Sequence, residues 1–171
     1  MKTKRIILRE RTADRMATVI SKDKNYQTTF FGTEEEQALT KELDRIRNGQ
    51  YNNYYSGPYF DLLLKENNKV IGSAGFHTWW RDHDRAEIGY GLTQEKYKRQ
   101  GFMNEVLPFI LDYGFKKMHL NRIEGKTAQD NIASITLLKK YGFKKEATIH
   151  GHYKMPDGSY SDDFLYYLLK Q

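Results

Sequence analysis

The chain has no cysteine and no long apolar run. Without cysteine there can be no disulfides and no zinc sites built on thiolates, and a cytoplasmic location is the default expectation. The apolar runs fall far short of the roughly 20 residues that a membrane-spanning helix needs. The opening, MKTKRIILRERTADR, turns charged again too soon for the apolar core of a signal peptide, so the mature protein is expected to begin near Met1.

What the chain does have is a mixed composition typical of a globular protein. Its 171 residues are 39% hydrophobic and carry a formal net charge of +6. Because no internal repeat or Pro/Ser-rich linker interrupts it, we expect a single domain over residues 1–171. The positive charge admits nucleic acid, an anionic membrane surface or a phosphorylated small molecule as a partner. The cations are scattered rather than grouped, which argues against nucleic acid.

The first part of the chain predicts one strand and two helices. RIILRE, residues 5–10, has the length and apolar content of a short strand. Residues 12–23 follow with apolar side chains at helical spacing. A second helix is expected within 32–50, where Thr33 and Glu36 have the spacing of a capping box.

Further along, the apolar pattern changes to that of strands. Two apolar runs within 59–80 flank KENNK, which predicts a β-hairpin with Asn67 and Asn68 in its turn. Residues 85–93 are predicted to form a third strand, joined to the hairpin by the charged turn RDHDR. A helix opening at FMNEVL is then expected to run to about Lys117.

The last part alternates strand and helix again. Residues 122–128 read as a strand, and the helix of DNIASITLLKKYGF has Asp130 or Asn131 as its cap and ends at Gly142. Residues 144–170 read as a final antiparallel pair around MPDG. The order β-α-α-β-β-β-α-β-α-β-β predicts an α+β fold with helices between the strands of one sheet.

Three cations and a glycine stand directly before a helix in KYKRQGFMNEVL, residues 96–107. A helix N-terminus has unpaired N–H groups and the positive end of the helix dipole, so it is a ready site for an anion. Gly101 permits a positive φ and close approach of a ligand, while Lys98 and Arg99 supply counter-charge. These features suggest a phosphate or pyrophosphate cradle, but from this stretch alone a plain glycine turn with solvated cations is the commoner case. Neither G-x-x-x-x-G-K-[ST] nor G-x-G-x-x-G occurs.

The order of these features resembles the GNAT superfamily of acyl-CoA-dependent N-acetyltransferases and, within it, the Rim-type branch of ribosomal-protein N-terminal acetyltransferases. The matching segments are RIILRE, residues 86–147 from AEIGYGL to FKKEA, and DGSYSDDFLYYLL, which together span nearly the whole chain. The resemblance implies an α+β GNAT fold. Its sheet would be mixed, mostly antiparallel and six- to seven-stranded, with helices on both faces and a splay between the fourth and fifth strands.

The same resemblance implies acetyl-CoA as co-substrate and no metal. The superfamily loop follows [QR]-x-x-G-x-[GA]. Here Gly101 matches, while Lys98 stands in the first place and Met103 in the last. By resemblance, the main-chain N–H groups of residues 99–104 hold the pyrophosphate, and the strand IGYGL binds the pantetheine arm. The residues assigned to the co-substrate in this way are Tyr90, Leu92, Lys98, Arg99, Gln100, Gly101, Phe102, Met103, Asn104 and Asn131.

Two residues are assigned catalytic roles by the resemblance. Glu87 lies where many GNAT enzymes place a carboxylate base, although a surface-strand glutamate paired with Arg85 or a neighbour would give the same sequence. Many members carry a proton-donating Tyr seven residues after the helix-opening Asn, and here that place is Leu138. Ser134, one helical turn earlier on the same face, is the expected donor instead of Tyr141. The alternative is that Ser134 only hydrogen-bonds the preceding turn or the co-substrate.

The resemblance therefore predicts transfer of an acetyl group from acetyl-CoA to a primary amine, by direct attack in a ternary complex. The acceptor would be a protein N-terminal α-amine or a small-molecule amine, and the protein a monomer or homodimer without nucleic-acid or membrane partners. A non-catalytic CoA-binding or regulatory module with the same fold is the alternative. His77, Asp82, His83 and Asp84 have a spacing that fits no zinc site. No motif in the sequence identifies the acceptor.

Overall fold

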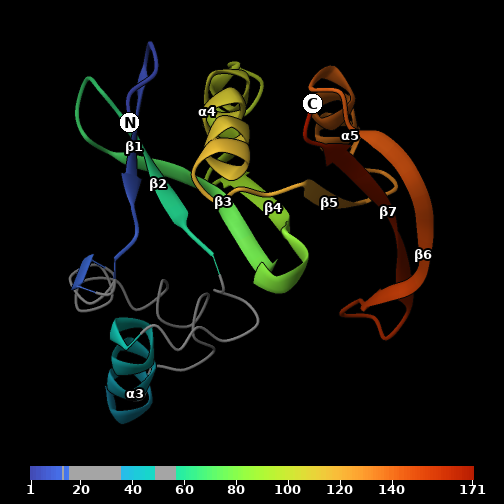
Figure 1. The fold of residues 1–171 in the computed structure, drawn as a ribbon, viewed down its shortest axis with the longest axis horizontal. Helices are drawn as coiled ribbons and strands as arrows, with labels where there is room; N and C mark the ends of the chain where they lie inside the picture. Colours follow the sequence, from blue (N-terminus) through green and yellow to red (C-terminus); the bar gives the residue numbers. More distant parts are fainter. Residues whose placement is uncertain (13, 16–35, 49–56) are drawn as a thin grey trace.

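The computed structural model describes residues 1–12, 14–15, 36–48 and 57–171 (Figure 1). Within these residues a seven-stranded sheet has the order β1-β2-β3-β4-β5-β7-β6. Its strands are β1 (Ile6–Glu10), β2 (Tyr59–Leu64), β3 (Val70–Trp80), β4 (Arg85–Leu92), β5 (Arg122–Ala128), β6 (Lys144–Lys154) and β7 (Tyr160–Leu169). The helices are α3 (Glu36–Arg47), α4 (Phe102–Lys116) and α5 (Ile132–Lys140), with short 3₁₀ turns at Arg81–His83 and Glu95–Tyr97.

The first four strands pair antiparallel with one another. Between β2 and β3 the N–H of Lys69 donates to Asn67 Oδ1 at 2.9 Å, and Asn68 takes a left-handed φ of 57°. Asparagine tolerates this conformation and can hydrogen-bond the backbone two residues on, so the chain reverses here. The predicted hairpin turn is confirmed.

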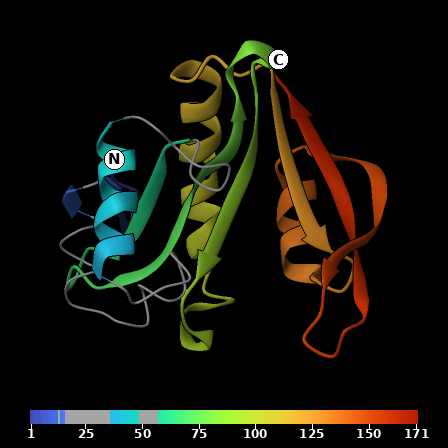
Figure 2. The same cartoon turned by 90° about the horizontal axis from the view of Figure 1, so that it is seen from below.

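The parallel pairing of β4 with β5 is short. Its register ends at Glu87 opposite Glu124, and beyond this point the two strands diverge, as Figure 2 shows. β5 instead pairs antiparallel with β7 along its whole length, from Arg122 to Ala128. The predicted splay between the fourth and fifth strands is confirmed, and it leaves one edge of β4 without a strand partner beyond Glu87 in the described residues.

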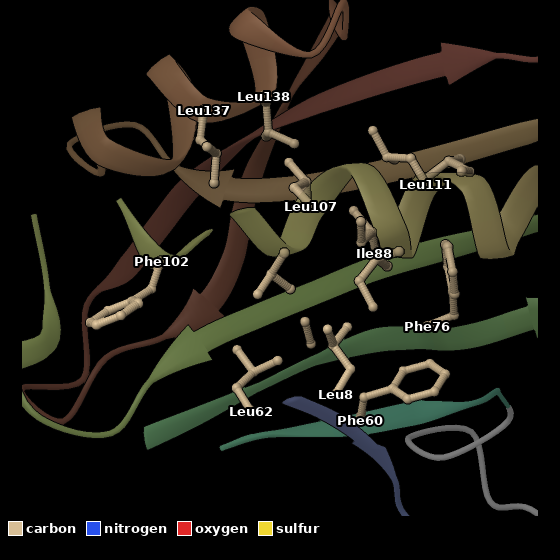
Figure 3. Close-up of a cluster of buried hydrophobic side chains, with 14 of the residues drawn as sticks. Leu8, Phe60, Leu62, Phe76, Ile88, Phe102, Leu107, Leu111, Leu137 and Leu138 are labelled. Atoms are coloured by element: carbon tan, nitrogen blue, oxygen red, sulfur yellow. The ribbon is translucent and has the colours of Figure 1, made fainter. Parts of the chain in front are cut away.

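Helices lie on both sides of the sheet, as predicted, with α4 and α5 on one side and α3 on the other (Figure 1). α4 approaches β3 closely, since a Cβ on Gly114 would lie 2.6 Å from Cζ of Phe76. Figure 3 shows leucines of α4 and α5 facing apolar side chains of the strands. Both helices bury apolar side chains against the sheet, and this burial holds the walls of the splay in place. Fully buried members of this core include Leu62, Phe76, Leu107, Ile110, Ile123 and Leu138.

The other elements expected from the pattern are present, with a few qualifications. Most of the helix expected over 12–23, and Thr33 of the capping box, lie outside the described residues. The charged turn RDHDR forms the 3₁₀ turn Arg81–His83. The single domain over residues 1–171 stays a prediction.

None of the helices in the described residues has both the length and the apolar character needed to cross a membrane.

Candidate active site

A cleft of about 1290 Å³ opens where β4 and β5 separate. β4 contributes residues 87–91 to its wall and β5 contributes residues 125–128. The start of α5 closes one part of the cleft and β7 another. The lining from outside these two strands includes Arg11, Tyr59, Ser73, His77, Asp130, Asn131, Ser134, Leu138, Tyr153, Ser161, Asp162 and Asp163.

Glu87 is a buried carboxylate in this cleft, with 7% of its surface exposed. Its Oε2 accepts a hydrogen bond from Lys126 Nζ at 2.8 Å, and its Oε1 lies 3.8 Å from Nε2 of His77. Arg85 pairs instead with Glu124, at 3.1 Å. In the alternative of a surface glutamate paired with Arg85 or a neighbour, the surface position and the Arg85 partner are therefore wrong, while an ion pair is present, with Lys126.

His77 stands opposite Glu87 in the β3–β4 register. Burial lowers the pKa of His77, Glu87 opposes that effect and Lys126 adds to it. The ring is thus neutral near neutral pH, and its Nδ1 lies 3.2 Å from Oγ1 of Thr78. A neutral imidazole beside a carboxylate can relay a proton, taking it up at one ring nitrogen and releasing one from the other, with no net change of charge in the cleft.

Tyr59 packs its hydroxyl against the backbone of β4. Burial raises the pKa of Tyr59 to about 12, with Arg11 opposing the rise and Glu87 adding to it. A Cβ on Gly89 would lie 2.5 Å from this hydroxyl, so only glycine permits the approach. The phenol stays protonated at physiological pH. Arg11 itself forms a buried ion pair with Asp61, with Nε 2.6 Å from Oδ1.

The N-terminal end of α5 forms the opposite wall. Asn131 Oδ1 accepts a hydrogen bond from the N–H of Ser134 at 3.1 Å, so the predicted Asn131 cap is confirmed. Burial raises the pKa of Tyr90, and a hydrogen bond between its hydroxyl and the Ser134 side chain opposes the rise. Tyr141 lies outside the cleft lining, because its Oη donates to the main-chain oxygen of Asn104 at 2.7 Å and ties α5 to α4.

The residues 98–104, hereafter the basic loop, have the backbone that a cradle needs. Gly101 is the N-cap of α4 with a φ of 78°, and as a glycine it has no side chain to cap the first turn of the helix. Arg99 also has a positive φ, of 60°. Lys98 forms an exposed ion pair with Glu95. The first N–H groups of α4 are therefore open to a ligand, as they are at any uncapped helix start.

Side chains near the start of the chain contact the basic loop, although they are far from it in sequence. Arg5 donates from Nη2 to the main-chain oxygen of Gln100 at 2.8 Å and forms an ion pair with Glu105. Thr3 Oγ1 also donates to Glu105, at 2.9 Å. Although burial opposes it, these hydrogen bonds hold the pKa of Glu105 below its usual value. These contacts of Thr3 and Arg5, hereafter the anchor, keep Glu105 charged in the first turn of α4, where a negative charge is favourable.

The structure brings four of the predicted site residues together and leaves the rest apart. Glu87, Tyr90, Asn131 and Ser134 line the cleft. The other eight lie outside its lining, at the end of β4, in the turn before α4 and in the first turn of α4: Leu92, Lys98, Arg99, Gln100, Gly101, Phe102, Met103 and Asn104.

Several cleft residues were missed by the sequence reasoning. Lys126 is the clearest case, and the alternation of RIEGKTA, which puts Glu124 and Lys126 on one strand face, was an available signal. Tyr59 and His77 carried no local pattern that links them to Glu87, since they meet it only through sheet register.

Two features of the cleft fit a long, amide-bearing co-substrate. The β4 edge that faces β5 has no strand partner beyond Glu87 in the described residues, so its main-chain groups can hydrogen-bond a ligand. Thr127 is 7% exposed, and its Oγ1 has no hydrogen-bond partner among the described residues. A polar atom buried in this way is costly unless a ligand or water meets it. In the described residues, no group of three or more His, Cys, Asp or Glu is placed to hold a metal.

Solved structures of known proteins share this fold. A spermidine N-acetyltransferase from Vibrio cholerae has a TM-score of 0.73 at 19% identity, covering 96% of this chain and 94% of that one. An acetyltransferase of the GNAT family from Bacillus anthracis has a TM-score of 0.65 at 22% identity, covering 99% and 97%.

Sequence comparison identifies the family. An N-acetyltransferase of Bacillus licheniformis, p20, is 38% identical over 66% of this chain and 62% of its own length. YoaA of Bacillus subtilis is 30% identical over 99% of this chain and 96% of its own. The alanine N-acetyltransferase of ribosomal protein uS5 from Escherichia coli is 27% identical over 95% and 87%. The acetyltransferase (GNAT) domain matches residues 5–144, and the chain therefore belongs to the GNAT family of acetyltransferases.

Proposed function

We propose that the protein transfers an acetyl group from acetyl-CoA to a primary amine, by direct attack in a ternary complex. The observation that carries this is the buried carboxylate of Glu87, in a cleft where the part of the β4 edge beyond Glu87 has no strand partner among the described residues. Bound acetyl-CoA supplies the thioester that the amine attacks. The cleft supplies a base, hydrogen-bond donors and walls that exclude water.

Glu87 is the proposed base. An acceptor amine arrives as an ammonium ion and must lose a proton before it can attack. The carboxylate of Glu87, whose Oε1 lies 3.8 Å from Nε2 of the neutral His77 ring, can take this proton. The non-catalytic alternative is less favoured, because binding CoA alone does not require a buried carboxylate, and burying one has a cost in desolvation.

The co-substrate would be held at two places. The N–H groups at the start of α4, in the basic loop, suit the pyrophosphate. The β4 edge beyond Glu87, which has no strand partner among the described residues, suits the amides of the pantetheine arm. Ser134 faces the hydroxyl of Tyr90 at the cleft wall. In this proposal Ser134 hydrogen-bonds the sulfur as negative charge develops there, and the main-chain N–H groups of residues 90–92 serve the carbonyl oxygen.

The acceptor is proposed to be cationic, either a small amine or a peptide α-amine. Glu87, Asp162 and Asp163 all line the cleft, which favours a positively charged ligand. One relative is named as an N-acetyltransferase of ribosomal-protein alanine, and one structural neighbour as a spermidine N-acetyltransferase. Both of these acceptors are amines of this kind. We also propose that the protein is a monomer or homodimer, acts in the cytoplasm and uses no metal.

The test is the release of free thiol from acetyl-CoA over a panel of polyamines, amino acids and short peptides. Turnover with at least one amine class, lost in Glu87→Gln, is expected. A protein that acetyl-CoA stabilises against heat, but that turns over none of the panel, would support the non-catalytic module instead.

A further inference from the structure

Lys126 places a primary amine directly at the proposed base. Its Nζ lies 2.8 Å from Oε2 of Glu87, within the 2.6–3.2 Å that a general base needs to accept a proton. An acceptor amine would have to reach this same place. We propose that Lys126 is itself an acetyl acceptor, so that the protein acetylates its own ε-amine when no free amine fills the cleft. This inference rests on the proposed function.

The strand geometry holds Lys126 in this position. Glu124 stands opposite Glu87 in the parallel register, and Lys126 follows two residues later, on the same face of β5. Its backbone is fixed by pairing with Leu165 of β7. The amine is thus tethered beside the base rather than delivered from solution. Intramolecular placement of this kind raises the effective concentration of a nucleophile by many orders of magnitude.

Lys126 differs from lysines that form similar ion pairs elsewhere. It is the one lysine among the described residues that line the cleft, and 25% of its side chain is exposed. Lys116 pairs with Asp112, and Lys98 with Glu95, but both pairs are exposed and lie outside the cleft. A lysine beside a carboxylate is therefore common to all three, while the cleft and the burial belong to Lys126.

The chemistry balances with acetyl-CoA as the co-reactant. The Lys126 ammonium gives one proton to Glu87, and the free amine attacks the thioester carbon. The carbon–sulfur bond breaks as the amide bond forms. The sulfur leaves as thiolate and takes up the second proton lost by nitrogen, while Glu87 returns its proton to solvent. The products are acetylated Lys126, free CoA and one released proton.

Acetylation would change the cleft in a defined way. It removes the positive charge that pairs with Glu87 and puts a neutral amide where an incoming amine must bind. A free amine acceptor and Lys126 therefore compete for the same place, and a bound acceptor should protect Lys126 from acetylation.

The test is peptide mapping by mass spectrometry after incubation with acetyl-CoA in the absence of an amine. Lys126 should be acetylated faster than Lys116 or Lys98 by roughly 10² or more, the contribution expected of a base. Glu87→Gln should remove the labelling of Lys126 and leave that of Lys116 unchanged. An amine from the panel should suppress Lys126 labelling in proportion to its own turnover. The thermal shift caused by acetyl-CoA shows that each variant is folded and binds the co-substrate.

Several results would overturn the inference. Equal labelling of Lys126 and Lys116, or labelling of Lys126 that persists in Glu87→Gln, would mean uncatalysed acetylation. If panel amines are acetylated while Lys126 stays unlabelled without them, this inference fails and the proposed function stands. If neither an amine nor Lys126 is acetylated, both fail. Lys126→Arg is the control for peptide assignment, because it keeps the charge and should give no label at this position.

Discussion

The basic loop and the floor of the cleft around Glu87 are built in different ways. The loop presents main-chain N–H groups, a left-handed glycine and exposed cations. The cleft floor is made of side chains from three strands: the half-buried Tyr59 from β2 and His77 from β3, and the buried Glu87 from β4. A site made of backbone depends on local conformation, whereas a site made of side chains depends on sheet register. Mutations should therefore separate co-substrate binding from chemistry.

The largest effect is expected at Glu87. Glu87→Gln should lower kcat by roughly 10²–10⁴, because the amine then lacks a base. The variant should still bind acetyl-CoA, since the basic loop is untouched. Steady-state kinetics and the thermal shift with acetyl-CoA measure the two effects separately, and a variant with wild-type turnover would refute the assignment.

A substitution at Gly101 should weaken co-substrate binding rather than the chemical step. Gly101→Val puts a branched side chain at a φ of 78°, which costs about 1–3 kcal/mol of strain. It should also abolish most of the thermal shift produced by acetyl-CoA. Gly158→Val is the matched control, because its φ of 87° imposes similar strain at a site where a Cβ meets nothing within 4 Å. Retention of the full shift in Gly101→Val would place the phosphate site elsewhere.

A smaller loss is expected at the α5 wall. Ser134→Ala should reduce kcat about tenfold, which corresponds to one transition-state hydrogen bond of about 1.4 kcal/mol. Tyr141→Phe should leave kcat nearly unchanged, because its hydroxyl is bonded to the main chain of Asn104 outside the cleft. The opposite pattern, with activity lost only in the Tyr141 variant, would make Tyr141 the donor.

The smallest effect concerns pH and stability. Burial lowers the pKa of His77 from its ordinary 6.5 in the folded protein. Above that value the ring is neutral in both states and adds nothing. As the pH falls below it, the unfolded chain takes up a proton that the folded protein does not, so stability decreases. The melting temperature of the wild type should therefore fall more steeply below pH 6.5 than that of His77→Gln. His83→Gln, at an exposed histidine, should behave like the wild type.

The sequence predicted the order of the elements better than it predicted the cleft floor, and the basic loop as a phosphate site stays a prediction. The order of elements and the Asn131 cap rest on local patterns, and these are features that a single chain segment can encode. The splay, in contrast, was expected only from the resemblance to the GNAT superfamily. Lys126, Tyr59 and His77 meet Glu87 because strands distant in sequence pair in one register. No local spacing specifies that register, so the partners of Glu87 became visible only in three dimensions.

The anchor between Arg5 and the basic loop has a practical consequence for handling the protein. Arg5 and Gln100 are 95 residues apart in sequence, yet the Arg5 side chain holds the main-chain oxygen of Gln100 directly before Gly101. Thr3 and Arg5 also fix Glu105, within the first turn of α4. Proteolytic trimming of the first five residues, or a bulky affinity tag that displaces them, should thus weaken acetyl-CoA binding at a distance. A tag at the other end of the chain leaves this anchor intact.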